Sequence, residues 1–158
     1  MSSLRIGHGF DSHEFKPGVK LVIGGLEIAC DSGLAGHSDG DVLLHAVTDA
    51  LLGAASGGDI GSHFPPSDPQ WKGAASSLFV GEAMRIVTGK GYKVVNLDAT
   101  LILKRPKIGP LREQLQASVA TLLGVEPDAV SIKAKTPEGL NLDGTAQAHA
   151  VVLLEKIS

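Results

Sequence analysis

Alternating apolar and polar residues near the start of the chain predict a β-strand. Leu4 and Ile6 alternate with polar or small residues in LRIGHGFDSHEF, and side chains two positions apart in a strand point to the same face. Further on, KLVIGGLEIAC places two β-type runs on either side of Gly24-Gly25, which is typical of a β-hairpin. We therefore expect a strand followed by a hairpin.

Helical spacing first appears in the segment from about Asp39 to Ser56. An apolar stripe recurs there at intervals of three and four residues, formed by Leu43, Val47, Ala50, Leu51 and Ala54. The pair Gly57-Gly58 favours the end of the helix. The following HFPPSDPQWKG is rich in proline and is expected to be a loop.

Two further helices are expected in the second half of the chain. Ser76 or Ser77 is suited to cap a helix that runs to about Lys90. Pro110 suits the first turn of another helix, which Gly124 closes. The segments VVNLDATLIL, VSIKAK and AQAHAVVLLEK alternate as strands.

The order of these elements predicts an α/β (α+β) fold. A strand, a hairpin, two helices, a strand, a helix and two strands form a mixed β-sheet most simply when the helices pack on one face. The 158 residues correspond to a single domain, residues 1–158. Aromatic residues make up only 4%, and the open face of the sheet also needs cover. Self-association is one way to provide it.

Composition excludes several classes of protein. With 43% hydrophobic residues the chain can bury a core without disulfides, and its one cysteine, Cys30, suits a reducing compartment. The net charge is −3 without a basic run, which argues against nucleic acid and membrane surfaces. MSSLRIG lacks the apolar core of a signal peptide. We expect a cytoplasmic protein.

The segment GFDSHEF carries the first candidate metal ligands. If the strand continues, Asp11 and His13 point to the same face. A carboxylate oxygen and an imidazole nitrogen on one face are a suitable pair of Zn²⁺ ligands. The alternative is an ordinary hydrogen-bonded Asp–His pair at a strand end.

The predicted first helix supplies a third candidate, His45. Asp41 and Asp49, four residues to either side, are placed to orient its imidazole. The alternative is a solvated polar face, with Asp41 in a capping box begun by Ser38. Three protein ligands would leave the fourth zinc position open, which is typical of catalytic and substrate-binding sites.

Other polar residues suit a phosphorylated substrate. His37 and Ser38 precede a helix start, where backbone N–H groups bind phosphate, although Ser38 also suits simple capping. Asp59 lies in the glycine-rich GGDIG, where it can accept hydrogen bonds from hydroxyl groups or serve only as a turn residue. Lys72 can meet a phosphate, but an ordinary surface lysine is the simpler interpretation.

Two charged segments complete the candidates. LKRPKIGP places Lys104, Arg105 and Lys107 in a short basic loop before a helix start, which favours a phosphate or nucleotide contact but is also common at surfaces. KAKTPEG places Glu138 after a strand, where one carboxylate with phosphate oxygens can hold Mg²⁺.

Taken together, these motifs resemble a known family. IGHGFDSH, GLAGHSDGDVLLHAVTDALLGAASGGDIGSHFPPSDPQWKG, RPKIGP and KAKTPEG look like the 2-C-methyl-D-erythritol 2,4-cyclodiphosphate synthases. The resemblance follows the same order over nearly the whole chain. It implies a lyase of the non-mevalonate isoprenoid pathway, which converts 4-diphosphocytidyl-2-C-methyl-D-erythritol 2-phosphate to the cyclic diphosphate and releases CMP. It further implies Zn²⁺, a second ion (Mg²⁺ or Mn²⁺), and a homotrimer whose active sites lie between subunits.

The resemblance also implies roles for individual residues. Asp11, His13 and His45 match the zinc ligands, Glu138 matches the ligand of the second ion, and His37 and Thr136 match the catalytic residues that stabilise the transition state. The positions that match substrate contacts are Asp11, Ser12, His13, His37, Ser38, Asp59, Ile60, Gly61, Phe64, Pro65, Pro66, Ser67, Asp68, Lys72, Leu103, Lys104, Arg105, Pro106, Lys107, Ile108, Gly109, Ala134, Lys135, Thr136 and Glu138.

Two departures and two alternatives remain. The segment EGLNLDGTAQAHA is short and lacks the Arg and the aromatic residue that many members carry there, although Leu142 can fill some of the space. Pro66 stands where an acidic residue is common. The alternatives are a zinc-dependent phosphoesterase acting on a nucleotide diphosphate and a non-catalytic nucleotide-binding module.

Overall fold

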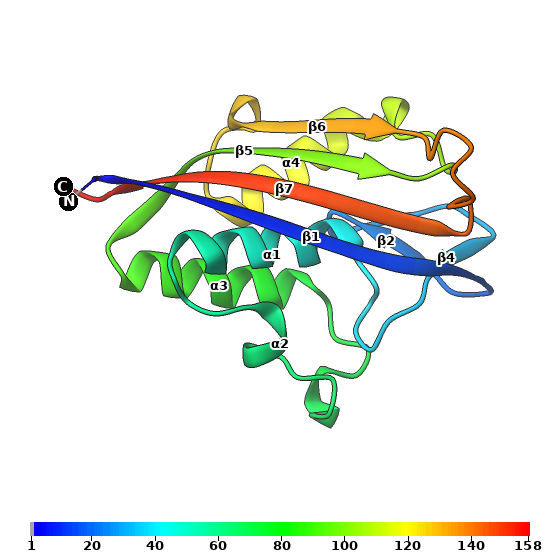
Figure 1. Cartoon of the computed structure of the whole chain (residues 1–158), viewed down its shortest axis with the longest axis horizontal. Coiled ribbons are helices and arrows are strands. Elements are labelled where there is room, and N and C mark those ends of the chain that lie inside the picture. Colours follow the sequence, from blue (N-terminus) through cyan, green and yellow to red (C-terminus); the bar gives the residue numbers. More distant parts are fainter. Residues whose placement is uncertain (1) are drawn as a thin grey trace.

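One curved, mixed sheet organises the chain. The computed structural model describes residues 2–158 and orders five strands as β4-β1-β7-β5-β6 (Figure 1). Only the β5–β6 pair is parallel among these neighbours. The strands are β1 (Leu4–Pro17), β4 (Ser32–Leu34), β5 (Tyr92–Ile102), β6 (Val130–Lys135) and β7 (Thr145–Lys156). The predicted hairpin is confirmed as a separate two-stranded sheet of β2 (Leu21–Ile23) and β3 (Leu26–Ile28).

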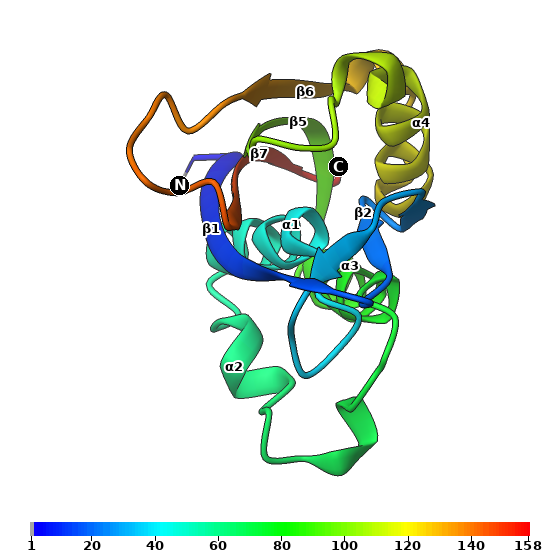
Figure 2. The ribbon, with the colours of Figure 1, turned by 90° about the vertical axis from the view of Figure 1, so that its right-hand side faces the viewer.

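The helices cover one face of this sheet, as predicted. The sheet curves around α1 (Val42–Ala54), while α3 (Ser77–Gly89) packs against α1 and α4 (Arg112–Leu123) lies beside β6 (Figure 2). On β5, Leu97, Ala99 and Leu101 are buried against the helices and alternate with more exposed residues. Within residues 2–158 no helix has the length and hydropathy needed to span a membrane.

Several details differ from the sequence prediction. The first helix begins at Val42, three residues later than predicted, because the buried carboxylate of Asp41 is its N-cap and accepts a hydrogen bond from the Leu44 N–H. The loop after this helix contains α2 (Ile60–His63) and a 3₁₀ turn over Pro69–Trp71. Strand β4 was not predicted, because three residues are too few for an alternating pattern. Further 3₁₀ turns cover Gly109–Leu111 and Pro127–Ala129.

Two glycines of β1 let α1 approach the strand unusually closely. A Cβ atom on Gly7 would lie 2.0 Å from the Ala50 carbonyl oxygen, and one on Gly9 would lie 1.8 Å from that of Ala46. Neither backbone leaves room for a side chain. The glycines beside the candidate ligands therefore serve packing, since they bring helix α1 against the strand that carries Asp11.

The opposite face of the sheet is open in the single chain. Exposed apolar side chains lie there on β1 and β7, with Ile6 at 72%, Phe10 at 47% and Val151 at 38% of their full exposure. These residues alternate with the buried glycines and apolar residues of the same strands. Two histidines, His8 and His149, lie among these apolar side chains. Exposed apolar side chains gathered on one face are typical of a surface that another protein surface covers.

Candidate metal and substrate site

The three predicted zinc ligands lie together between β1 and α1. Strand β1 continues to Pro17, so Asp11 and His13 share one face. An Asp11 carboxylate oxygen, Oδ2, lies 2.7 Å from His13 Nε2 and 3.0 Å from His45 Nδ1, and the two ring nitrogens are 3.1 Å apart. Among residues 2–158 this is the one group of three or more His, Cys, Asp or Glu side chains that could hold a metal ion.

The electrostatics of the group suit a cation. Burial alone would raise the pKa of Asp11, but hydrogen bonds and charge interactions with His13 and His45 bring it to about 2. Burial lowers the pKa of His13, but the hydrogen bond with Asp11, the negative charge of Asp11 and smaller contributions from Ala35 and Asp41 together outweigh burial and leave the pKa raised. One carboxylate and two imidazoles whose atoms converge on one point are the donor set of a three-ligand zinc site. The residues therefore fit this metal.

Serines, rather than the predicted aspartates, orient the His45 ring. Ser38 Oγ and Ser76 Oγ each lie 2.9 Å from His45 Nε2. The prediction that Asp41 and Asp49 orient the imidazole is wrong. Asp41 is buried and accepts hydrogen bonds from backbone N–H groups instead, while Asp49 accepts from the Ile60 N–H at the start of α2. A spacing of four residues placed them near the ring on the helix but could not show these partners.

A cavity of about 190 Å³ opens beside the triad. Among its lining residues are eight predicted site residues: His13, His37, Ser38, His45, Ile60, Gly61, Phe64 and Pro66. Trp71 and Phe79 also line it and were not predicted. The Phe64 and Phe79 rings stack with centroids 4.4 Å apart, and the Phe79 ring lies 5.8 Å from that of His45. The cavity is thus lined by an aromatic cluster as well as by two of the metal-ligand candidates, His13 and His45.

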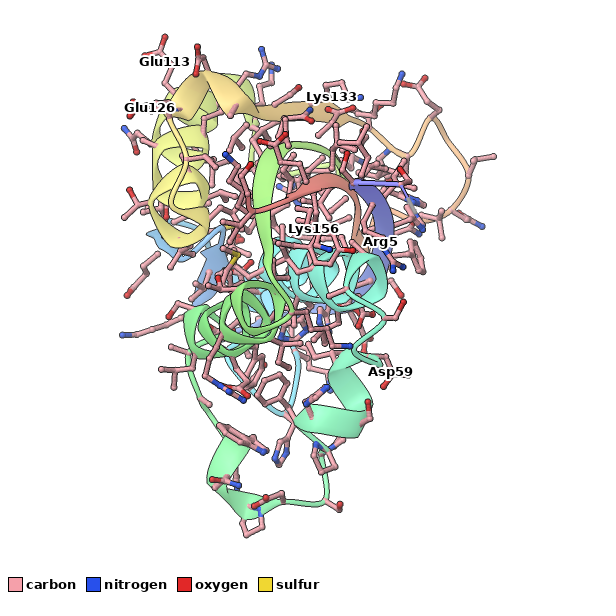
Figure 3. The ribbon with its side chains drawn as sticks, turned by 90° about the vertical axis from the view of Figure 1, so that its left-hand side faces the viewer. Arg5, Asp59, Glu113, Glu126, Lys133 and Lys156 are labelled. Atoms are coloured by element: carbon pink, nitrogen blue, oxygen red, sulfur yellow. The ribbon has the colours of Figure 1, made fainter. Side chains whose placement is uncertain are left out.

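Some of the loop residues predicted to contact substrate lie at the cavity, and others lie away from it. Pro66 lines the cavity, and the Asp68 carbonyl oxygen lies 3.3 Å from His37 Nε2. Asp59 is exposed beside α2 (Figure 3) and its carboxylate caps that helix. Lys72 is exposed at the end of the 3₁₀ turn. Neither side chain lines the cavity.

The remaining residues of this loop and of β1 are also exposed or half-buried. Pro65 is half-buried and Ser67 is exposed, and neither is among the residues that line the cavity. Ser12 is exposed on β1, between Asp11 and His13, so its side chain points to the opposite face from the triad. Sequence spacing placed all three near the site but could not show which way each side chain points.

The predicted nucleotide-binding segments line a second cavity. Its volume is about 320 Å³, and six of the seven residues from Leu103 to Gly109 line it together with Ala134–Thr136. Arg105 lies outside this set and lines a neighbouring pocket with Asp31 and Asp143. Arg112 lines the second cavity and was not predicted. Segments far apart in sequence therefore meet here, because β5 and β6 are parallel neighbours that end together.

Glu138 belongs to this second region. It has a positive φ of 53°, and one of its carboxylate oxygens accepts a 2.8 Å hydrogen bond from Thr136 Oγ1. Among the described residues no side chain lines both cavities. Figures 1 and 2 place the segment that follows β6 and the α2 segment at well-separated positions. A single chain therefore presents two separate cavities, each lined by predicted site residues. We call them the two partial sites.

Comparisons with known proteins agree with the motifs. The sequence profile described as the YgbB family matches residues 4–155. The 2-C-methyl-D-erythritol 2,4-cyclodiphosphate synthase of Koribacter versatilis is 66% identical over 97% of this chain and 99% of its own. The chloroplastic synthase of Arabidopsis thaliana is 54% identical over 96% of this chain and 67% of its own. A solved structure of such a synthase bound to CDP is 46% identical, with a TM-score of 0.91 over 96% of this chain and all of that one.

Proposed function

The chain belongs to the YgbB family, and we propose that it is a lyase that performs the reaction of its synthase relatives. It converts 4-diphosphocytidyl-2-C-methyl-D-erythritol 2-phosphate to 2-C-methyl-D-erythritol 2,4-cyclodiphosphate and releases CMP. The 2-phosphate oxygen attacks the β-phosphorus, and the bond from that phosphorus to the CMP oxygen breaks. The observation that carries this proposal is the triad of Asp11, His13 and His45 beside a cavity.

Charge is the main obstacle to this reaction. A phosphate must approach a diphosphate, so catalysis depends on positioning and on neutralising negative charge. We propose that Asp11, His13 and His45 hold Zn²⁺. When bound, the ion acts as a Lewis acid on a phosphate oxygen and as a template.

Residues around the first cavity position the methylerythritol part of the substrate. Ser38 presents its hydroxyl group and His37 its ring to the cavity, so both can donate hydrogen bonds to phosphate oxygens. Ile60 and Gly61 follow the capped start of α2 and line the same cavity. The aromatic wall of Phe64, Trp71 and Phe79 excludes water, which would otherwise compete as a nucleophile.

The second cavity suits the cytidine and its phosphate. Lys104, Lys107, Arg112 and Lys135 bring positive charge to its walls, and Thr136 presents a hydroxyl group at its edge. Arg112 and Lys135 are placed to supply charge that the missing arginine after Glu138 supplies in other members. We propose that Glu138 holds the second divalent ion, Mg²⁺ or Mn²⁺, together with phosphate oxygens.

The separation of the two cavities favours an active site shared between chains. We propose a homotrimer in which the zinc side of one subunit faces the cytidine side of its neighbour. The open apolar face of the sheet, with exposed Ile6 and Phe10, would be covered by the other copies. The same arrangement would supply each active site with both partial sites.

Phosphorus NMR of the reaction products tests this function. The purified protein is incubated with the cytidylyl substrate, Zn²⁺ and Mg²⁺. We expect CMP and two coupled phosphorus signals from a cyclic diphosphate. CMP with only linear phosphates would instead identify a phosphoesterase in which water attacks. Nucleotide binding without turnover would identify a binding module.

A further inference from the structure

We propose that Asp39 and Ser76 are positioning residues that hold the His45 ring by a hydrogen bond at Nε2, so that Nδ1 faces the metal site. This inference rests on the proposed zinc site. It concerns two residues outside the triad, one from the segment before α1 and one directly before α3. Neither residue takes part in the hydrogen bonds that join Asp11, His13 and His45 to one another.

A chain of short hydrogen bonds joins the three side chains. Ser76 is fully buried, and its Oγ lies 2.9 Å from His45 Nε2 and 2.5 Å from Asp39 Oδ1. The distance to Asp39 is that of a hydroxyl group bonded to an ionised carboxylate. The carboxylate is itself fixed, because the Ser76 N–H donates to its Oδ2 over 3.0 Å and the Asp41 N–H donates to its Oδ1 over 3.1 Å.

The number of protons on the three side chains decides which atom donates in each of these hydrogen bonds. An ionised carboxylate only accepts hydrogen bonds, so Ser76 must donate its single hydroxyl proton to Asp39. Ser76 Oγ then has only lone pairs left for His45, and Nε2 must be the donor. A neutral imidazole carries one N–H. When zinc is bound at Nδ1, the one N–H of the ring is on Nε2, and the Ser76 oxygen accepts its hydrogen bond.

Ser38 differs from Ser76 in this respect, although its Oγ lies at the same 2.9 Å from His45 Nε2. Within residues 2–158 the Ser38 hydroxyl group has no hydrogen bond to a carboxylate like the one that Ser76 makes to Asp39. Its proton is free to turn toward a phosphate in the cavity that it lines. The two serines therefore divide two tasks: Ser76 orients the metal ligand and Ser38 contacts substrate.

Backbone hydrogen bonds hold the two segments that carry Asp39 and Ser76 in a fixed relative position. The Gly73 N–H donates to the His37 carbonyl over 2.7 Å, and the Asp39 N–H donates to that of Ala74 over 3.0 Å. The end of the loop that lines the first cavity is thereby tied to the segment before α1. Ser76 cannot shift relative to Asp39 without breaking several of these bonds.

The protonated nitrogen can be observed directly by NMR. Long-range proton–nitrogen correlation spectra of the zinc-loaded protein, labelled on histidine, show which ring nitrogen carries the proton, and His45→Gln identifies the His45 signals. We expect wild-type His45 to carry an Nε2–H that exchanges slowly with solvent, and Ser76→Ala to lose this protection. A wild-type ring protonated on Nδ1, or equal protection in Ser76→Ala, would overturn the proposal.

Zinc affinity, measured by competition with a chromogenic chelator, gives a second readout that needs no substrate. Ser76→Ala should bind zinc about tenfold more weakly, whereas Ser77→Ala, the neighbouring serine, should bind as the wild type does. Ser38→Ala should keep its zinc affinity within about threefold and raise KM. Equal zinc affinity in Ser76→Ala and Ser77→Ala would refute the role of Ser76.

A double variant tests whether Asp39 acts through Ser76. Asp39→Asn should weaken zinc binding in the wild-type background but add little to Ser76→Ala, because the path to His45 is already broken. If the two substitutions weakened zinc binding independently and additively, Asp39 would not act through Ser76. Since the NMR and zinc measurements use no substrate, a failure of the proposed synthase reaction would appear separately, as missing turnover with these results intact.

Discussion

The two partial sites of this chain differ in how completely folding assembles them. The triad lies where α1 packs against Gly7 and Gly9 of β1, and its three donor atoms are within 3.1 Å of one another. The cytidine side is built from exposed loops, and its Lys104–Asp143 ion pair joins side chains that are 56% and 53% exposed. Such exposed pairs contribute little to stability. The fold therefore holds the triad through close packing, whereas an exposed ion pair adds little to the order of the proposed cytidine side.

The largest effect on the triad is expected from a substitution that pushes α1 away from β1. Gly9→Ala would place a Cβ atom 1.8 Å from the Ala46 carbonyl oxygen, and neither backbone can yield. We expect a loss of about 3 kcal/mol or more in the free energy of unfolding, together with loss of zinc, measured by urea unfolding and metal analysis.

Gly81→Ala is the matched control, because a Cβ atom there meets nothing within 4 Å in the middle of α3. It should stabilise the protein by about 0.5–1 kcal/mol. If Gly9→Ala were tolerated as well as Gly81→Ala, close packing at Gly9 would not be what assembles the zinc side.

Removing one ligand should abolish zinc binding without unfolding the chain. His45→Ala deletes a half-buried ring whose contacts are the triad and two serines. We expect zinc content near zero and turnover lower by about 10³-fold, with unchanged circular dichroism. Metal analysis that finds wild-type zinc in this variant would contradict the ligand assignment.

The pH dependence of stability tests the buried carboxylate of Asp41, which caps the helix that carries His45. Burial raises the pKa of Asp41 from 3.8 to about 6 in the folded protein, although three backbone N–H groups donate to it. A raised folded-state pKa means that the contribution to stability is complete below pH 3.8 and is lost as the pH rises through about 6. The shift corresponds to a loss of about 3 kcal/mol.

Comparison with Asp41→Asn isolates this group. The free energy of unfolding of the wild type, minus that of the variant, should fall between pH 4 and about 6 and then stay level. Urea unfolding at a fixed chain concentration measures both proteins. A difference that rises with pH would show that the backbone donors, rather than burial, dominate at Asp41.

The smallest effect is expected on the cytidine side. Glu138→Gln keeps the shape of the side chain, whose carboxylate is exposed and bonded to Thr136, so the fold should be unaffected. We expect about tenfold more Mg²⁺ to be required for half-maximal activity, with zinc content unchanged. If titration of Mg²⁺ gave the wild-type curve, another group would hold the second ion.

Patterns within single elements predicted the triad well. Period-two spacing placed Asp11 and His13 on one face of a strand that the structure confirms. Helical spacing placed His45 on a polar face, and the residue types suggested a three-ligand zinc site before the family resemblance supported the same set. The resemblance also grouped Leu103–Gly109 with Ala134–Thr136, and most of these residues line one cavity.

Contacts between distant segments were beyond the sequence. Ser76 meets His45 only because the segment after the loop packs against the segment before α1. For the same reason Trp71 and Phe79 could not be assigned to the cavity. Asp41 and Asp49 were assigned to the wrong partners, since helical spacing shows which residues are near the ring and not which groups they bond.

Mixing two inactive variants tests most directly whether the two partial sites of different chains form one active site. His45→Ala lacks the zinc side but keeps the cytidine side, and Glu138→Lys, whose positive charge would repel the second ion, does the reverse. Co-expressed at equal levels, they should recover about a quarter of wild-type activity, because one in four neighbouring pairs then combines two intact sides. No recovery in mixed oligomers of correctly folded chains would show that each chain builds its active site alone.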